Sequence, residues 1–535
     1  MVVAADDNPG KGKSKGKQYT RSRTGCLTCR QRHQKCDETR PVWSVIYALS
    51  HTLLGNCLLV QRQCEYPTAV LPLRERRKKF LPGEQQPWTN AVTISRAIGP
   101  GTSVATRPIS MAYRSDALFH YFYDLEDPFD VAPKERRQSL LSSTMHSSDT
   151  LRNTMLIAGL HFAWNTGQLQ SFEPTFLFHK IEAMNSVNKF LRNSRMKYAV
   201  CVRNIATLCF TECAMGNIIA SETHLDGLMR FMDLHRPPHK APLAESDLDD
   251  ELANRYVLFS YNFIHGFKSR VEDVLINGSV TKTSQTPSPA LVEKLMHEWH
   301  KHEVQGLDIR LKSLKMIPFF FSELPPNTKF VDIDGTATAE CLATLTATAQ
   351  LRTQGMDFDD QQMIWQEGAA TRLMLAFVGS HIESISTGGR KGSVPNGSRM
   401  ASSWSGMAAA TGLYLHTILR FWNAGEPIEP RLHRRVLLVL QQDLERSRRT
   451  SRPLNDLWFW KAFVGAMTVE RQVASPARGV LNEMKWIYES FVREWGIMIG
   501  TTTWEQARAA LSRIVWPEVF HSEGMAQELW YRCVS

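Results

Sequence analysis

Several features of enzymes and exported proteins are missing from this sequence. It contains no glycine-rich phosphate loop and no G-x-S-x-G turn, which carries the nucleophile in many hydrolases. The segment His297 to His300 is one residue short of the H-E-x-x-H zinc motif, because Lys301 stands where the second ligand belongs. Residues 1–20 are rich in glycine and lysine without an apolar core segment, so we expect a disordered basic tail and no signal peptide. We predict that the protein is not an enzyme.

Long apolar runs are also scarce. Pro41 to Gln61 carries no charged residue, and Val42 to Val60 is about long enough to span a bilayer. That stretch includes His51, Asn56 and several serine and threonine residues, which are costly in hydrocarbon. We therefore predict no membrane segment and no membrane partner.

Net charge is absent from most of the chain and concentrated at its start. The protein has a formal net charge of +10. Residues 1–80 hold 16 Lys and Arg against six acidic residues, while the other 455 residues carry 47 basic and 47 acidic groups. A local basic excess is the electrostatic footprint of a phosphate-bearing partner such as nucleic acid. The basic runs 10–17 and 74–79 are also typical of nuclear-import patches, so we expect a nuclear protein.

Cysteine is scarce, with ten in 535 residues, yet five of the ten fall within one window of 39 residues. These five are Cys26, Cys29, Cys36, Cys57 and Cys64. Thiolates at close spacing in a chain without a secretory signal indicate zinc, because tetrahedral zinc accepts sulfur ligands from short loops. The remaining cysteines are scattered, as in proteins of reducing compartments. Cys209 and Cys213 lie in an apolar stretch, and we predict that they are buried structural thiols.

The cysteine spacing resembles that of the fungal zinc binuclear cluster, the six-cysteine pattern C-x2-C-x6-C-x5–12-C-x2-C-x6–8-C. Cys26 to Cys36 matches the first half of this pattern, and Cys57 to Cys64 matches its last step. The fourth cysteine is absent, and Trp43 stands at its position. Replacing Trp43 to Leu54 by a single cysteine would restore the family spacing. We interpret this segment as an insertion, either genuine or produced by a gene-model error such as a retained intron.

The resemblance implies two zinc ions bridged by the first and fourth cysteines of the pattern. Two tetrahedral ions have eight coordination positions, which six thiolates fill when two of them bridge, whereas five thiolates with one bridge fill six. The sequence as written could hold one ion, through Cys26, Cys29, Cys36 and either Cys57 or Cys64, or none. Because metal supplies much of the folding free energy of such modules, a damaged site would leave this region unfolded.

The same resemblance implies double-stranded DNA as the partner. Residues 28–36 are polar and basic without proline, which favours a short helix after the first cysteine pair. In the family this helix enters the major groove at a CGG triplet. By resemblance, Arg32 and His33 occupy the base-contacting positions, while Arg30 and Lys35 contact phosphates. Arginine suits guanine because its donors reach O6 and N7 together.

The expected fold class is mostly α, with a small N-terminal zinc-cluster module, a linker and a large all-α stack of helical hairpins. We place the module at 21–70, interrupted by the insertion 43–54, and a basic patch with a proline- and glycine-rich linker at 71–110. The helical region follows at 111–535. No sustained heptad repeat follows the module, so the sequence leaves open whether the protein is a homodimer.

The region 111–535 has the apolar periodicity of helices. Three sets of apolar residues each share one helical face: Leu177, Ile181, Met184 and Leu191; Leu225, Leu228, Met229 and Met232; and Leu437, Leu440 and Leu444. The region resembles the fungal-specific transcription-factor regulatory domain in three segments, 120–122, 224–228 and 457–465. We predict that the aromatic residues of the last segment belong to the core; they are Trp458, Trp460 and Phe463.

Together these features predict a fungal, nuclear, zinc-dependent regulator of transcription by RNA polymerase II that recognises CGG-type promoter sites. In this hypothesis the helical region transmits regulation to the transcription machinery. Members of the family commonly control biosynthetic gene clusters, so a role in secondary metabolism is one expectation.

Two other hypotheses come from different classes. In the second hypothesis, the protein as written has lost DNA binding and acts through its helical region as an interaction or ligand-sensing module. In the third hypothesis it is a redox enzyme that uses Cys26 and Cys29, which is disfavoured because no βαβ pattern surrounds the pair.

Zinc content separates the first two hypotheses. Residues 18–80, produced from a transcript that lacks the insertion, should bind two zinc ions, because six thiolates then complete both coordination shells. Elemental analysis of the purified module is the measurement. A verified transcript that encodes Trp43, together with a module that holds no zinc, would favour the loss of DNA binding.

Overall fold

The structure is a computed structural model, in which the residues described below all belong to the compact unit 100–535. Twelve stretches are described: 109–124, 147–192, 198–235, 248–277, 304–322, 324, 328–353, 369–387, 398–420, 428–449, 455–473 and 481–535. The predicted zinc-cluster module lies outside these residues, and so do the Val42 to Val60 segment and His297 to His300.

The described part of the chain is mostly helical, which confirms the predicted α class for this part. In the first half the helices are α4 (Ser115–Asp124), α6 (Ser148–Thr166), α7 (Glu173–Arg192), α8 (Tyr198–Ala214), α9 (Ile218–His235), α10 (Leu248–Asn277) and α12 (Val304–Phe320), with the 3-10 turn η2 (Gln170–Phe172) before α7. In the second half they are α13 (Thr336–Thr353), α15 (Ala369–Ser384), α16 (Trp404–Leu413), the π-helical turn η4 (Tyr414–Ile418), α17 (Ile428–Arg449), α18 (Asp456–Val473), α19 (Asn482–Ile499), α20 (Trp504–Ser512) and α21 (Glu523–Val534).

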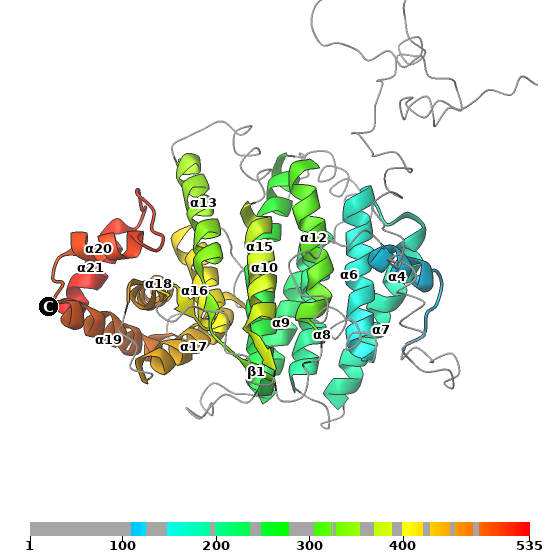
Figure 1. Ribbon diagram of the computed structural model, residues 1–535, viewed down its shortest axis with the longest axis horizontal. Helices are drawn as coiled ribbons and strands as arrows, with labels where there is room; N and C mark the ends of the chain where they lie inside the picture. Colours follow the sequence, from blue (N-terminus) through cyan, green and yellow to red (C-terminus); the bar gives the residue numbers. More distant parts are fainter. Residues whose placement is uncertain are drawn as a thin grey trace, which may run out of the picture. The chain divides into compact units, whose positions relative to one another are not determined.

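Several helices of the first half, together with α15 of the second, run side by side. Figure 1 shows α6, α8, α10, α12 and α15 along a common direction, and α8 packs against both α9 and α10. Almost every residue of α8 is buried. A helix that is enclosed on nearly all sides lies in the interior of such a stack. The neighbouring α6 begins at the N-cap Ser147, whose side chain accepts a hydrogen bond from the Thr150 N–H, and ends at Gly167 with a φ of 85°.

Among the described residues, four short strands join segments that are distant in sequence. They are β1 (Thr328–Phe330), β2 (Ile333–Asp334), β3 (Ile385–Thr387) and β4 (Ala401–Ser402). The strands β1 and β3 pair antiparallel, as do β2 and β4. The buried guanidinium of Arg255 on α10 lies 3.5 Å from the centroid of the Phe330 ring on β1 and donates to Ser384 Oγ on α15 at 2.7 Å. This side chain therefore links α10, α15 and the first strand.

The core of the second half is built around α16. All ten of its residues are buried, and it packs against α10, α17 and α18. Small residues make this possible, because Gly406 lies against the Asp443 side chain and Gly412 against the Tyr261 ring. A Cβ atom at either glycine would lie less than 2.5 Å from those side chains. Close packing of this kind leaves little room for displacement.

The predicted apolar faces agree with the structure in two helices and differ in a third. Leu225, Leu228, Met229 and Met232 on α9 are buried, and so are Leu437, Leu440 and Leu444 on α17. The prediction of core positions for Trp458, Trp460 and Phe463 is also confirmed. On α7, however, Leu177, Ile181 and Leu191 are between 45% and 55% exposed. This helix turns Phe176, His179 and Ala183 inward instead, since its periodicity fixes which residues share a face but not which face packs.

None of the helices in the described stretches combines the length and the apolar character that crossing a membrane requires.

Gly465 on α18 tests how tightly the helices pack. An added Cβ would lie 2.1 Å from Cε1 of Tyr488, a buried ring whose hydroxyl donates to the Leu437 carbonyl at 2.6 Å. We expect Gly465→Ala to destabilise the protein by about 1–3 kcal/mol, because overpacking outweighs the gain in helix propensity. The measurement is chemical denaturation. Gly227→Ala on α9, where the Cβ meets nothing within 4 Å, is the matched control. It should stabilise the protein by up to about 1 kcal/mol, and equal effects of the two substitutions would contradict the packing.

Candidate functional site

The residues predicted to bind zinc and DNA lie outside the described part of the chain. They are Cys26, Cys29, Cys36, Cys57 and Cys64 for zinc, and Arg30, Arg32, His33 and Lys35 for DNA. Their roles therefore stay predictions. The described residues offer a different candidate site, where η4, α17 and α18 meet in the core.

The turn η4 continues α16 with a wider helical winding. The Leu419 N–H donates to the Tyr414 carbonyl, five residues earlier, at 3.1 Å, and all five residues of the turn are buried. Single π-helical turns are uncommon and often occur at functional sites. This turn carries His416, and on α18 Thr468 Oγ1 lies 2.9 Å from Thr417 Oγ1 of the turn.

The second part of the site comes from the start of α17. Pro430 stands in the first turn of this helix, where a missing N–H costs nothing. Glu429 and His433 are four residues apart, so they share one face of the helix. His433 is fully buried, and the Glu429 side chain is 14% exposed.

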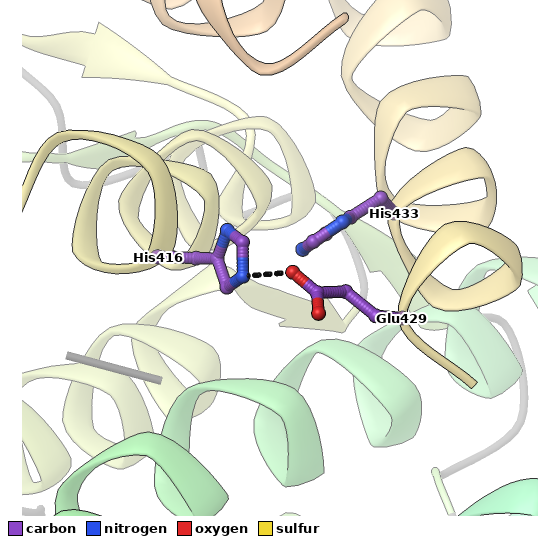
Figure 2. Close-up of side chains that lie close together, drawn as sticks. All are labelled: His416, Glu429 and His433. Atoms are coloured by element: carbon purple, nitrogen blue, oxygen red, sulfur yellow. Dashed lines mark ion pairs between the residues drawn. The ribbon is translucent and has the colours of Figure 1, made fainter. Parts of the chain in front are cut away.

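The three side chains converge on one point. Figure 2 shows His416 facing the two residues of α17, with its Nε2 atom 2.5 Å from Oε1 of Glu429. The rings of His416 and His433 lie 4.1 Å apart between centroids. One nitrogen from each histidine and a carboxylate oxygen of Glu429 all lie within 4.8 Å of one another. We call these three residues the His–Glu–His cluster.

Two residues of α18 support the cluster. Gln472 Nε2 donates to Oε1 of Glu429 at 3.2 Å and lies 3.1 Å from Nδ1 of His433. Arg471 Nη1 donates to the carbonyl oxygens of His416 and Thr417 at 3.3 and 2.9 Å. The contacts of Gln472 fix the side chains of Glu429 and His433, and those of Arg471 hold the backbone of the π-helical turn. Both histidines are thereby held in place by neighbours outside the cluster.

The electrostatics of the cluster favour neutral imidazole beside an ionised carboxylate. Burial lowers the pKa of His416 below its usual range, although Glu429 opposes this. Burial by itself would raise the pKa of Glu429, but its hydrogen bonds with His416 and Gln472 and the charge of Arg471 lower it overall. These are the protonation states in which imidazole and carboxylate bind metal ions.

The cluster is a metal-ligand set more than a catalytic one. Both histidines are at most 2% exposed, so substrate access is restricted in the state described. Described cysteines do not supply a nucleophile, because burial raises the pKa of Cys201 and Cys533 to about 12 and that of Cys341 to about 11. Cys209 and Cys213 are buried, as predicted.

A second polar group in the same core is an ion pair. Lys461 Nζ on α18 lies 2.7 Å from Oδ2 of Asp443 and 2.5 Å from Oγ of Ser402. Ser403 Oγ donates to Oδ1 of the same aspartate at 2.5 Å and also caps α16. Burial by itself would raise the pKa of Asp443, but the charge of Lys461 and these hydrogen bonds hold it below the usual range. Every one of these contacts joins packed segments, which indicates a structural role.

The sequence interpretation did not single out the His–Glu–His cluster. A signal was present in the E-x-x-x-H spacing of Glu429 and His433, which puts a carboxylate and an imidazole on one helical face. His416 gave no such signal, because the turn that carries it is brought to α17 only by the packing of α16.

The buried ion pair gives a stability prediction. We expect Lys461→Met to cost about 3–5 kcal/mol, because it leaves the Asp443 carboxylate buried without its counter-charge. The matched control is Lys485→Met, which removes a partly exposed pair with Glu470 and should cost less than about 1 kcal/mol.

The same ion pair predicts a dependence of stability on pH. Since folding lowers the pKa of Asp443, the contribution of this carboxylate to the free energy of unfolding is present above the ordinary aspartate pKa and disappears as the pH falls through the folded-state value. Denaturation at neutral and acidic pH measures both effects, and equal costs for the two variants would argue against the pair.

Comparison with known proteins gives one partial match. A stretch of 90 residues is 34% identical to a protein named transcription factor lfc1 from Flammulina velutipes. The match covers 17% of this chain and 28% of that relative, so the chain matches less than a third of the relative's length. No family model and no solved structure matches the chain.

Proposed function

We propose that this protein is a nuclear, zinc-dependent regulator that binds CGG-type promoter sites and controls transcription by RNA polymerase II. The observation that carries the proposal is the spacing of Cys26, Cys29, Cys36, Cys57 and Cys64 within a strongly basic segment. Thiolates at this spacing suit zinc, and the surrounding charge suits the phosphates of DNA. The partial identity with a protein named as a transcription factor supports the same class.

The proposal divides the chain into two parts with different functions. The excess positive charge of the whole protein resides in residues 1–80, where the proposed module binds DNA. The helical part carries balanced charge, and we assign it the regulatory contacts with the transcription machinery. Arg32 and His33 would contact bases, while Arg30 and Lys35 would contact phosphates.

A second candidate function is favoured by Trp43. A tryptophan in place of the fourth cysteine removes a bridging thiolate, and a module without its metal would not fold. The protein would then act through its helical part alone, as an interaction or ligand-sensing module. The two candidates differ in whether the chain binds promoter DNA at all.

A gel-shift titration of the full chain tests both candidates. The chain as written is compared with a variant in which Trp43 to Leu54 is replaced by one cysteine, on duplexes with a CGG triplet and with the triplet scrambled. We expect the variant to prefer CGG and its binding to weaken steeply with salt, because phosphate contacts release counterions. Equal affinity for the two duplexes, or no binding by the variant, would contradict the proposal.

Two substitutions in the cysteine-restored chain separate base contacts from phosphate contacts. Arg32→Ala should cost about 1–3 kcal/mol on the CGG duplex and remove the preference over the scrambled one. Lys35→Ala should weaken binding to both duplexes by a similar factor and reduce the salt dependence by about one ion. The measurement is affinity at several salt concentrations, and a uniform loss for Arg32→Ala would show that this arginine does not contact a base.

A further inference from the structure

A set of metal-binding side chains lies in the helical part of the chain, far in sequence from the cysteines discussed above. The His–Glu–His cluster places two imidazole nitrogens and a carboxylate oxygen within 4.8 Å of one another. Two histidines and one glutamate are a recurrent ligand set for zinc, and they leave a fourth position for water or a small ligand. This donor chemistry differs from that of a thiolate cluster.

The three proposed ligands come from two separate elements, and their positions fit a metal ion. Glu429 and His433 are fixed on one face of α17, and His416 reaches them from η4 (Figure 2). An ion held between them would join the π-helical turn to the first turns of α17. Zinc–nitrogen and zinc–oxygen bonds are about 2.0–2.2 Å long, which puts the ligand atoms of a tetrahedral ion roughly 3.3–3.6 Å apart. The three ligand atoms lie within 4.8 Å of one another, and the 2.5 Å contact between His416 and Glu429 would lengthen when both atoms bind the ion.

The surroundings supply the outer contacts that metal-binding residues need. Metal-bound histidines commonly use their second nitrogen in a hydrogen bond that sets the ring orientation. The amide nitrogen of Gln472 lies 3.1 Å from Nδ1 of His433 and limits rotation of this ring. The same glutamine donates to Glu429, and Arg471 fixes the backbone carbonyl of His416.

The ordinary alternative is a buried hydrogen bond between His416 and Glu429 with a second ring packed beside it. In that arrangement Nε2–H of His416 donates to Oε1 of Glu429 at 2.5 Å. It leaves a carboxylate that is only 14% exposed beside two buried imidazole rings, and burying charge of this kind is costly. A divalent cation would neutralise the carboxylate and engage all three side chains. Arg471 opposes a cation electrostatically, although its guanidinium is directed at backbone carbonyl oxygens.

We propose that His416, Glu429 and His433 bind one zinc ion between η4 and α17, with the fourth coordination position taken by water or a small anionic ligand. The site is independent of the proposed DNA-binding function. It stabilises the junction of η4, α17 and α18 and makes the stability of the helical part depend on zinc.

The test uses the full chain with Cys26, Cys29, Cys36, Cys57 and Cys64 replaced by serine, so that thiolate-bound metal is removed. After equilibration with Zn²⁺ and removal of excess metal, elemental analysis should find one ion per chain. His433→Gln in this background should weaken Zn²⁺ binding by more than the roughly 10–100-fold typical of changes to outer contacts. The matched control is His179→Gln, since His179 on α7 is equally buried and contacts Ser115 instead of a carboxylate. This control should keep its zinc.

A second readout guards against a folding defect in the variant. The serine-substituted chain with its histidines intact is titrated with Co²⁺, which should give visible bands of nitrogen and oxygen ligation. Glu429→Gln, nearly isosteric, should lose these bands while circular dichroism stays unchanged. A folded serine-substituted chain that binds neither Zn²⁺ nor Co²⁺, or variants that bind them as tightly as the control, would overturn the proposal. An unsubstituted chain that holds no more zinc than the serine-substituted chain would instead count against the proposed zinc-dependent DNA binding.

Discussion

The complete burial of α16 is the constraint on which the second half of the structure depends. Every residue of this helix is enclosed, so its neighbours α10, α17 and α18 must approach it on all sides. The approach is close only because Gly406 and Gly412 lack side chains at the contacts with Asp443 and Tyr261. Because a close-packed core leaves little room for displacement, this packing fixes the direction of α16 and of the turn η4 that continues it. The position of His416 on η4 is fixed in the same way.

Two polar groups in this core meet the cost of burial in different ways. Asp443 is paired with Lys461 and accepts further hydrogen bonds, so its charge is balanced within the protein. The His–Glu–His cluster gathers three possible metal ligands around one point and takes support from Gln472. We propose that a metal ion balances this second group. The chain would then use imidazole and carboxylate ligands for zinc in its helical part and thiolates near its start.

The proposed function assigns one role to the basic residues 1–80 and another to the helical part, whose charge is balanced. In this proposal, electrostatic attraction to DNA belongs to residues 1–80, because the other residues carry equal numbers of basic and acidic groups. A helical part with balanced charge and the proposed zinc site would suit regulation, since metal or ligand binding there would change stability without altering the residues proposed to contact DNA. The proposed zinc binding by residues 1–80 depends on Trp43, because this residue stands where the resemblance places a bridging thiolate.

Local sequence patterns were enough to predict the helical class of the described residues, the buried faces of α9 and α17, and the core positions of Trp458 and Trp460. These follow from local periodicity and apolar character, which the chain carries in each short segment. Which face of α7 is buried depends on how this helix packs against its neighbours. The approach of His416 to Glu429 and His433 likewise depends on packing between elements. Contacts between elements depend on how whole helices pack, and no local pattern encodes the partner across a core.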